Sequence, residues 1–399
     1  MISSKALPSS EPSNLGFVPE RFEPLRRRLQ QFVDDGQHAG ISVLLVRNGG
    51  IAETFATGYR NRELGLPMSR ETIVRIYSMT KIVVSVTALT LLEEGKLGLL
   101  DPVTDYLPEF RNLQVLVGGT AQDPQFVAAD KPLTIQHLFT HTSGLIYDAP
   151  GEPIDEFYRP LDEEAGNSLE ELVSRLARLP LKWHPGTHFD YGYSTDVLGR
   201  VIEVITGLRL DASLRTRVLE PLGMIDTAYA VADAKKERLA KVYEHRGTGA
   251  LHPVTSLKGE RVEGQRDFPG GGAGLFSTLD DYARFAQMLC NGGELAGARI
   301  IGRKTLDLMV ANHLTGLAVP FHNVGVGYGF GLGVDVRLDD GLAGTLGTLG
   351  SFGWSGMATT YCRIDPAEKL VALCFAQHLP YNEHGLFQRF ANLVYQALV

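Results

Sequence analysis

Residues 77–95 read Tyr77-Ser78-Met79-Thr80-Lys81-Ile82-Val83-Val84-Ser85-Val86-Thr87-Ala88-Leu89-Thr90-Leu91-Leu92-Glu93-Glu94-Gly95. The run is apolar nearly all round, which predicts a helix buried on every side rather than a surface helix. Its β-branched residues are mediocre helix formers, so tertiary burial has to hold the helix. We expect Ser78 to be the N-cap residue and Gly95 to end the helix. The stretch is therefore predicted to be the buried central helix of the protein.

Ser78 and Lys81 lie three residues apart in this run, so both side chains face the same side of one helical turn. There the lysine amine can take or hold the serine proton, which converts a poor nucleophile into an acylating one. A helix N-terminus also favours the negative charge of an oxyanion. About one S-x-x-K pair is expected by chance in a chain of this size. On position alone, an N-cap serine beside a solvated lysine therefore stays open as the alternative.

Composition limits the classes of protein to which the chain can belong. It has 399 residues, 44% hydrophobic and 21% charged, as expected of one large or two intimately joined globular domains. The net charge of −8 predicts neither a nucleic-acid nor a membrane partner. The three cysteines have no metal-ligand or disulfide spacing, and the N-terminus has no signal-peptide pattern. We therefore expect a cytoplasmic protein.

Periodicity predicts strands near both ends of the chain and helices between them. The predicted helices cover residues 19–35, 77–95, 134–139, 168–178, 195–206, 211–218, 278–291 and 383–398. The predicted strands cover residues 40–47, 51–59, 328–336, 355–364 and 370–377.

This order predicts an α+β fold, with one antiparallel sheet built from both chain ends, flanked by helices, and a mainly helical domain inserted into it. Residues 1–18 would form a loose arm. Residues 19–110 and 321–399 would form a discontinuous α/β domain, and residues 111–320 the helical domain. We expect the active site in the cleft between the two domains.

Two further segments carry residues suited to chemistry. Tyr191 follows a Pro-Gly turn, and a tyrosine beside a lysine can act as a general base or acid. Tyr193 competes for that role, and a hydrogen-bonded core tyrosine is the alternative for either. The stretch Gly353-Trp354-Ser355-Gly356-Met357 opens a predicted strand, where a free N–H can complete an oxyanion hole. A glycine turn with a core tryptophan is equally compatible with it.

The motifs Ser78-Met79-Thr80-Lys81, Tyr191-Gly192-Tyr193 and Trp354-Ser355-Gly356 occur in this order along the chain. Together they resemble the serine β-lactamase and penicillin-binding-protein superfamily. Within it, the chain looks most like the family VIII carboxylesterases, the class C β-lactamase-like esterases. The stretches 138–145, 270–278 and 364–377 support the resemblance, which covers nearly the whole chain from about residue 20.

The resemblance implies a β-lactamase-like fold and a role for each motif residue. Ser78 would be the acylated nucleophile, Lys81 would share its proton, and Tyr191 would be the base. The backbone N–H groups of Ser78 and Met357 would form the oxyanion hole. Trp354, Ser355, Gly356, Tyr193 and Tyr147 would contact a small ester substrate.

Two departures from the class C β-lactamase pattern bear on the substrate. Tyr193 stands where that class has an asparagine, and Trp354 stands where it has a lysine that pairs with the antibiotic's carboxylate. An indole carries no positive charge, so recognition of a carboxylate is lost unless another cation replaces it. The resemblance therefore implies a carboxylesterase for neutral, short-chain esters with weak or no β-lactamase activity.

Other functions stay open at this stage. An acyltransferase would use the same acyl-enzyme, and a β-lactamase or D-amino-acid peptidase would need a replacement cation. A non-catalytic binding protein on the same scaffold is a further alternative. An ordinary α/β-hydrolase is disfavoured because the chain has no G-x-S-x-G motif. Acyl-chain length, stereopreference and oligomeric state are not readable from the sequence.

The spacing of the histidines does not indicate a metal site. His137 and His141 have the spacing of a metal-binding pair but lack the glutamate of H-E-x-x-H, and His184 and His188 are separated by Pro185-Gly186. All four are predicted to be polar histidines with hydrogen-bond partners. We therefore expect no metal and no cofactor.

Overall fold

An eight-stranded sheet forms the centre of the computed structural model, which describes residues 6–163, 167–246, 249–255, 260–262, 265–266, 268–317 and 324–399. The strands lie in the order β14-β15-β16-β17-β18-β1-β2-β3, and every neighbouring pair is antiparallel. The strands are β1 (Gly40–Arg47), β2 (Gly50–Asn61), β3 (Leu66–Pro67), β14 (Tyr328–Phe330), β15 (Asp335–Arg337), β16 (Phe352–Gly356), β17 (Thr360–Asp365) and β18 (Leu370–Ala376). The sheet thus joins the two ends of the chain, as predicted.

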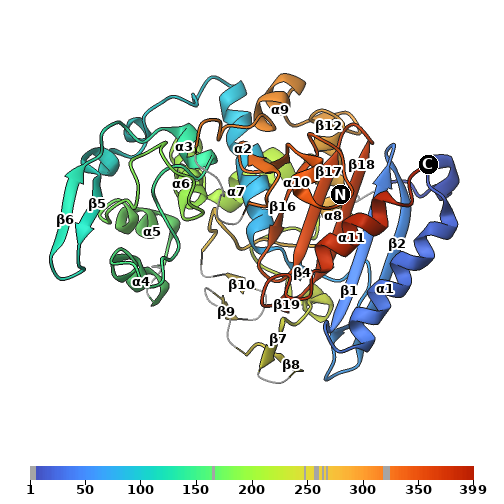
Figure 1. The fold of residues 1–399 in the computed structure, drawn as a ribbon. Coiled ribbons are helices and arrows are strands. Elements are labelled where there is room, and N and C mark those ends of the chain that lie inside the picture. Colours follow the sequence, from blue (N-terminus) through green and yellow to red (C-terminus); the bar gives the residue numbers. More distant parts are fainter. Residues whose placement is uncertain are drawn as a thin grey trace.

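The central strands are buried on both faces, and alternation along β1 assigns its side chains to two cores. Ile41, Val43 and Leu45 pack with α1 (Phe22–Asp34) and α11 (Leu386–Tyr395). Leu44 and Val46 belong to the larger core on the other face, which includes α2 (Thr80–Glu93) and α8 (Leu279–Cys290). Figure 1 shows α1 and α11 side by side over the sheet. The molecule is therefore layered helix–sheet–helix.

Residues 77–95 form the buried helix that the sequence predicts, since α2 is buried from Thr80 to Leu91. Gly95 follows its end with a positive φ of 68°, which a side chain would make costly. Ser78, however, is not the N-cap residue. It lies one residue before the N-cap residue Met79, in the 3₁₀ segment Tyr77–Met79, and no side chain caps α2.

Helices α3 to α7 and a hairpin lie beside the sheet. α6 packs against α2, α3, α5 and α7, which makes it the centre of this region. The hairpin formed by β5 and β6 lies at the end of the region farthest from the large sheet (Figure 1). The bounds are α3 (Ile135–Phe139), α4 (Asp155–Glu163), α5 (Leu169–Leu176), α6 (Ser194–Thr206), α7 (Leu210–Leu214), β5 (Gln114–Gly119) and β6 (Pro124–Ala128).

Further short elements complete the strands and α-helices of the described residues. They are β4 (Val74–Arg75), β7 (Tyr243–Arg246), β8 (Ala250–Pro253), β9 (Glu260–Val262), β10 (Gln265–Arg266), β11 (Phe276–Ser277), β12 (Glu294–Leu295), β13 (Ala298–Arg299), β19 (His378–Leu379), α9 (Arg303–Met309) and α10 (Asp340–Ala343).

Two predicted strands need correction, and one predicted helix lies elsewhere than expected. The predicted strands 328–336 and 355–364 are each a hairpin, the second turning through Thr359 at a φ of 62°. Helix α8, predicted within the helical domain, packs instead on β1, β17 and β18. The predicted domain boundary at residues 320 and 321 lies outside the described residues. The division into two domains therefore remains a proposal.

The N-terminal arm is not loose between residues 6 and 18. Ile51 donates a backbone hydrogen bond to the Pro8 carbonyl at 2.7 Å, and Val399 donates one to the Gly16 carbonyl at 3.1 Å. Phe17 is 1% exposed and its ring packs on Phe22 at 5.1 Å. The arm fills the end of the smaller core because β2, α1 and the C-terminus leave an apolar surface there.

We predict that Phe17→Ala lowers the free energy of unfolding by about 3 kcal/mol, because it removes a fully buried ring. Denaturant unfolding followed by circular dichroism measures this change. Ser13→Ala, at an exposed position of the same arm, is the matched control and should be neutral. Equal stability of the two variants would mean that the arm does not contribute to the fold.

Candidate active site

Ser78 lies on a tight turn between β4 and the start of α2. The preceding residue, Tyr77, has a φ of 43°, a left-handed conformation that is strained for a tyrosine. Gly356 of β16 approaches this turn so closely that a Cβ there would lie 2.4 Å from the Ile76 carbonyl oxygen. Glycine at 356 is thus needed for packing the strand against the turn.

Lys81 reaches back from the first turn of α2 to the Ser78 hydroxyl. Its Nζ lies 3.3 Å from Ser78 Oγ and donates to the Gly272 carbonyl at 2.7 Å. Lys81 is 1% exposed, so the solvated lysine considered in the sequence analysis is wrong. A buried amine needs such partners, because leaving its N–H groups unpaired costs several kcal/mol.

Two aromatic rings complete the surroundings of Lys81. Its Nζ lies 4.5 Å from the centre of the Tyr191 ring and 5.2 Å from that of Tyr147, within cation–π range. Gly272 is held in place by its own N–H, which donates to Asp196 Oδ1 of α6 at 2.9 Å. The serine–lysine pair is therefore fixed by two distant segments of the chain.

Tyr191 precedes α6 and accepts a hydrogen bond from Trp354. The distance from the indole Nε1 to the Tyr191 hydroxyl oxygen is 2.9 Å. Trp354 is buried in the middle of β16, where its ring packs edge-on against Phe330 at 5.2 Å. A donor aimed at the phenol oxygen and a cation against the phenol ring both favour negative charge on that oxygen. Trp354 thus contacts the predicted base itself, which the sequence analysis did not anticipate.

His141 supports the Tyr191 loop from behind and was not predicted to do so. Its buried ring lies 4.5 Å from the Tyr191 ring, and its Nδ1 accepts from the Gly192 N–H at 3.3 Å. Burial and the nearby Lys81 hold the pKa of His141 well below its usual value, so the ring is neutral. The only signal in the sequence was its place within the stretch 138–145.

The two other tyrosines differ in accessibility. Tyr147 is half-buried and lies 5.7 Å from Tyr191 and 4.7 Å from Tyr193, measured between ring centres. Burial, and then the carboxylate of Asp196, raise the pKa of Tyr147 well above its usual value, so it stays a neutral phenol. Tyr193 is buried in the large core and flanks α6 as its N-cap residue. The core alternative therefore describes Tyr193 better than a substrate contact does.

The end of β16 presents two further predicted residues. The Ser355 hydroxyl shares a 2.7 Å hydrogen bond with the hydroxyl of Tyr381, a neighbour that the sequence analysis missed. Met357 is half-exposed in the turn that follows. Its backbone comes directly after Gly356, which packs against the Ser78 turn.

The four histidines singled out in the sequence all have polar partners, as predicted. His137 closes a capping box with Thr134, and His184 Nδ1 accepts from the Asp130 N–H at 3.2 Å. His188 stacks on Trp183 at 3.9 Å and hydrogen-bonds with Thr187.

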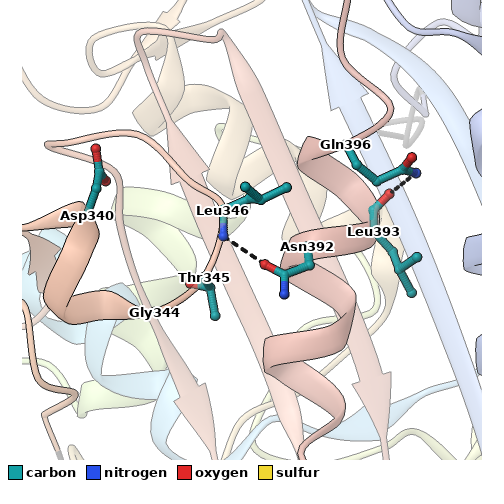
Figure 2. A pocket seen from close by; sticks show the side chains of 7 residues that line it. All are labelled: Asp340, Gly344, Thr345, Leu346, Asn392, Leu393 and Gln396. Atoms are coloured by element: carbon teal, nitrogen blue, oxygen red, sulfur yellow. Dashed lines mark hydrogen bonds between the residues drawn. The ribbon is translucent and has the colours of Figure 1, made fainter.

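A separate pocket lies where α10 and the following segment meet α11. Figure 2 shows its lining, in which the Leu346 N–H donates to Asn392 Oδ1 at 2.7 Å. None of its seven lining residues belongs to the predicted site, and none is a nucleophile paired with a base. The pocket offers no arrangement for acyl chemistry.

Comparison with known proteins identifies the family. The family model described as Beta-lactamase matches residues 25–396. The chain belongs to this family. Protein Rv1367c of Mycobacterium tuberculosis is 33% identical over 88% of this chain and 89% of its own length. Esterase EstB of Burkholderia gladioli is 32% identical over 80% of each chain.

The solved structures agree with this assignment. The structure described as "EstCE1, a hydrolase with promiscuous acyltransferase activity" superposes with a TM-score of 0.78 at 27% identity, covering 95% of this chain and 98% of its own. The β-lactamase-like fold predicted from the sequence is therefore confirmed. No helix in the described part of the chain is both long and apolar enough to cross a membrane.

We predict that Trp354→Phe slows labelling of Ser78 by a fluorophosphonate reagent by about 10- to 100-fold. The variant keeps an aromatic ring but loses a hydrogen bond to a group that carries charge during the reaction, worth about 1.5–3 kcal/mol. Trp183→Phe is the matched control, since its indole donates to Asp190 at 3.2 Å outside this set. Equal labelling rates for both variants would show that the Trp354 contact with Tyr191 is only structural.

Proposed function

We propose that the chain is a carboxylesterase that hydrolyses small neutral esters through an acyl-enzyme on Ser78. The observation that carries the proposal is the connected set Ser78–Lys81–Tyr191–Trp354, in which each member contacts the next. The esterase name of the Burkholderia gladioli relative and the hydrolase title of EstCE1 support the same reaction class.

In the acylation step, Ser78 Oγ attacks the ester carbonyl carbon. Its proton passes to the phenolate form of Tyr191, which becomes a neutral phenol, while the Lys81 amine holds the serine oxygen. The backbone N–H groups of Ser78 and Met357 stabilise the oxyanion, a role suited to a strand end packed against the nucleophile turn. The tetrahedral intermediate collapses, the C–O bond to the alcohol breaks, and the alcohol leaves with the proton from Tyr191.

Deacylation repeats these steps with water as the nucleophile. The water oxygen attacks the acyl carbon while Tyr191 accepts a proton from the water. The proton then passes to Ser78 Oγ as the acid leaves. The Trp354 N–H stabilises the negative charge that Tyr191 carries as a phenolate before it takes the proton in each step and regains when it gives the proton up. Lys81, enclosed by Gly272 and two rings, keeps its position throughout.

The surroundings of Trp354 support a neutral substrate. β16 reads Phe352-Gly353-Trp354-Ser355-Gly356 and carries no cationic side chain. On the neighbouring strand, Arg363 is buried and paired with Asp335 at 2.6 Å. A substrate carboxylate would therefore find no free cation on these two strands, and its desolvation would be uncompensated. Tyr147 and Ser355, both partly exposed, are proposed to contact the ester.

Acyl transfer is the second candidate, because EstCE1 is described as a hydrolase with promiscuous acyltransferase activity. It differs only in the acceptor, an alcohol in place of water. An assay with an added alcohol decides, since transfer yields a new ester at the expense of free acid.

A cytoplasmic location also remains a proposal. It is supported by Cys290, Cys362 and Cys374, all of which are free thiols, as expected in a reducing compartment.

We predict that Ser78→Ala lowers kcat for p-nitrophenyl butyrate by about a thousandfold or more, because no acyl-enzyme can form. Steady-state hydrolysis measures the loss. Ser85→Ala is the matched control, since this serine is buried in α2 and lies outside the connected set. Retained turnover in Ser78→Ala would overturn the assignment of the nucleophile.

We also predict that wild-type kcat/KM for p-nitrophenyl butyrate exceeds that for nitrocefin by at least about a hundredfold, because a buried charge without a partner costs about 3 kcal/mol. Parallel assays of both substrates measure the ratio. Comparable values would show that another cation recognises the β-lactam carboxylate.

A further inference from the structure

Four residues with metal-binding side chains meet away from the set around Ser78. His245 lies on β7, His378 lies on β19, and Glu383 and His384 lie in the loop before α11. β19 runs parallel to β7, with His378 opposite Tyr243. We call these four residues the His–Glu cluster. No spacing in the sequence indicates it, because only Glu383 and His384 are neighbours along the chain.

One atom from each residue points into a common space. Glu383 Oε2 lies 2.8 Å from His245 Nδ1, 3.1 Å from His378 Nε2 and 3.4 Å from His384 Nε2. His384 Nε2 lies 3.4 Å from His245 Nδ1, and all four atoms lie within 4.8 Å of one another. Four ligands of a tetrahedral zinc ion, at about 2.0–2.1 Å from the metal, lie about 3.3 Å apart. The cluster is close to that size.

The tautomer of His245 argues for a cation in this space. Its Nε2 lies 3.3 Å from the Gly36 carbonyl oxygen, which can only accept, so Nε2 carries the hydrogen. In the neutral ring, Nδ1 of His245 then presents a lone pair to Glu383 Oε2, which also presents lone pairs, so the two atoms repel each other. A cation bound by both atoms removes this repulsion. A ring N–H held by a backbone carbonyl is also the usual second contact of a metal-bound histidine.

A buried histidine beside the cluster provides an independent observation. His38 is 1% exposed, and its ring lies 4.5 Å from that of His378 and 5.8 Å from that of His384. Among the described residues, neither of its ring nitrogens has a hydrogen-bond partner, nor does His378 Nδ1. Unpaired buried polar atoms are costly, and their gathering beside the cluster points to a ligand there.

We propose that His245, His378, Glu383 and His384 bind a divalent transition-metal ion, with zinc the best match to three nitrogen ligands and one oxygen ligand. Four protein ligands close the coordination sphere, which is typical of a structural rather than a catalytic site. The ion would fasten β7 and β19 to the loop before α11. That loop also carries Tyr381, whose hydroxyl contacts Ser355. The proposal does not depend on the reaction at Ser78.

The test is isothermal titration of Zn²⁺ into the full chain after treatment with EDTA. We expect one Zn²⁺ per wild-type chain, and binding at least about a hundredfold weaker for His384→Gln and for Glu383→Gln, each of which removes one ligand. His252→Gln is the matched control, because His252 lies on β8 beside β7 but is exposed and outside the cluster. It should bind like the wild type.

Thermal unfolding separates metal binding from a general folding defect. Zn²⁺ should raise the Tm of the wild type and of His252→Gln by several degrees but leave that of His384→Gln unchanged. Absence of stoichiometric binding in the wild type would overturn the proposal and leave the cluster as a hydrogen-bonded ion pair. Equal affinity in the wild type and in His384→Gln would overturn it as well.

Discussion

The buried amino group of Lys81 is the constraint on which the site depends. Withdrawing such a group from water costs several kcal/mol unless hydrogen bonds and aromatic faces replace the solvent. Gly272 and Tyr191 supply that replacement here, from segments far from α2 in sequence. Gly272 in turn is held by Asp196. The need to satisfy one amine therefore brings the helical region and the sheet region together at Ser78.

Much of this arrangement could be predicted because its signals are local. The apolar run from Ile82 to Leu92 predicts α2, and the alternating or continuous apolar patterns predict β1 and β18. The motif residues Ser78, Lys81 and Tyr191 were identified from their order along the chain, and the structure brings them into contact. Such elements can be predicted because the pattern of apolar residues within one helix or strand already shows which of its faces is buried.

What could not be predicted depends on contacts between distant residues. The turn at Thr359 needs a left-handed conformation, and a threonine at this position does not indicate one in the sequence. The hydrogen bond from Trp354 to Tyr191 joins β16 to the segment before α6, and nothing near either residue specifies it. The His–Glu cluster likewise arises only when β7 meets β19, and the N-terminal arm is docked only when β2 and the C-terminal residues are in place.

The pairing of β1 with β18 has a consequence for how the chain is made. Ile41 lies opposite Ala376, so the inner neighbour of β1 is synthesised about 335 residues after β1 itself. Until then β1 has β2 alone as a partner in the sheet. The central strand of the sheet thus presents an unpaired edge during synthesis of the residues between, an edge that chaperones can protect.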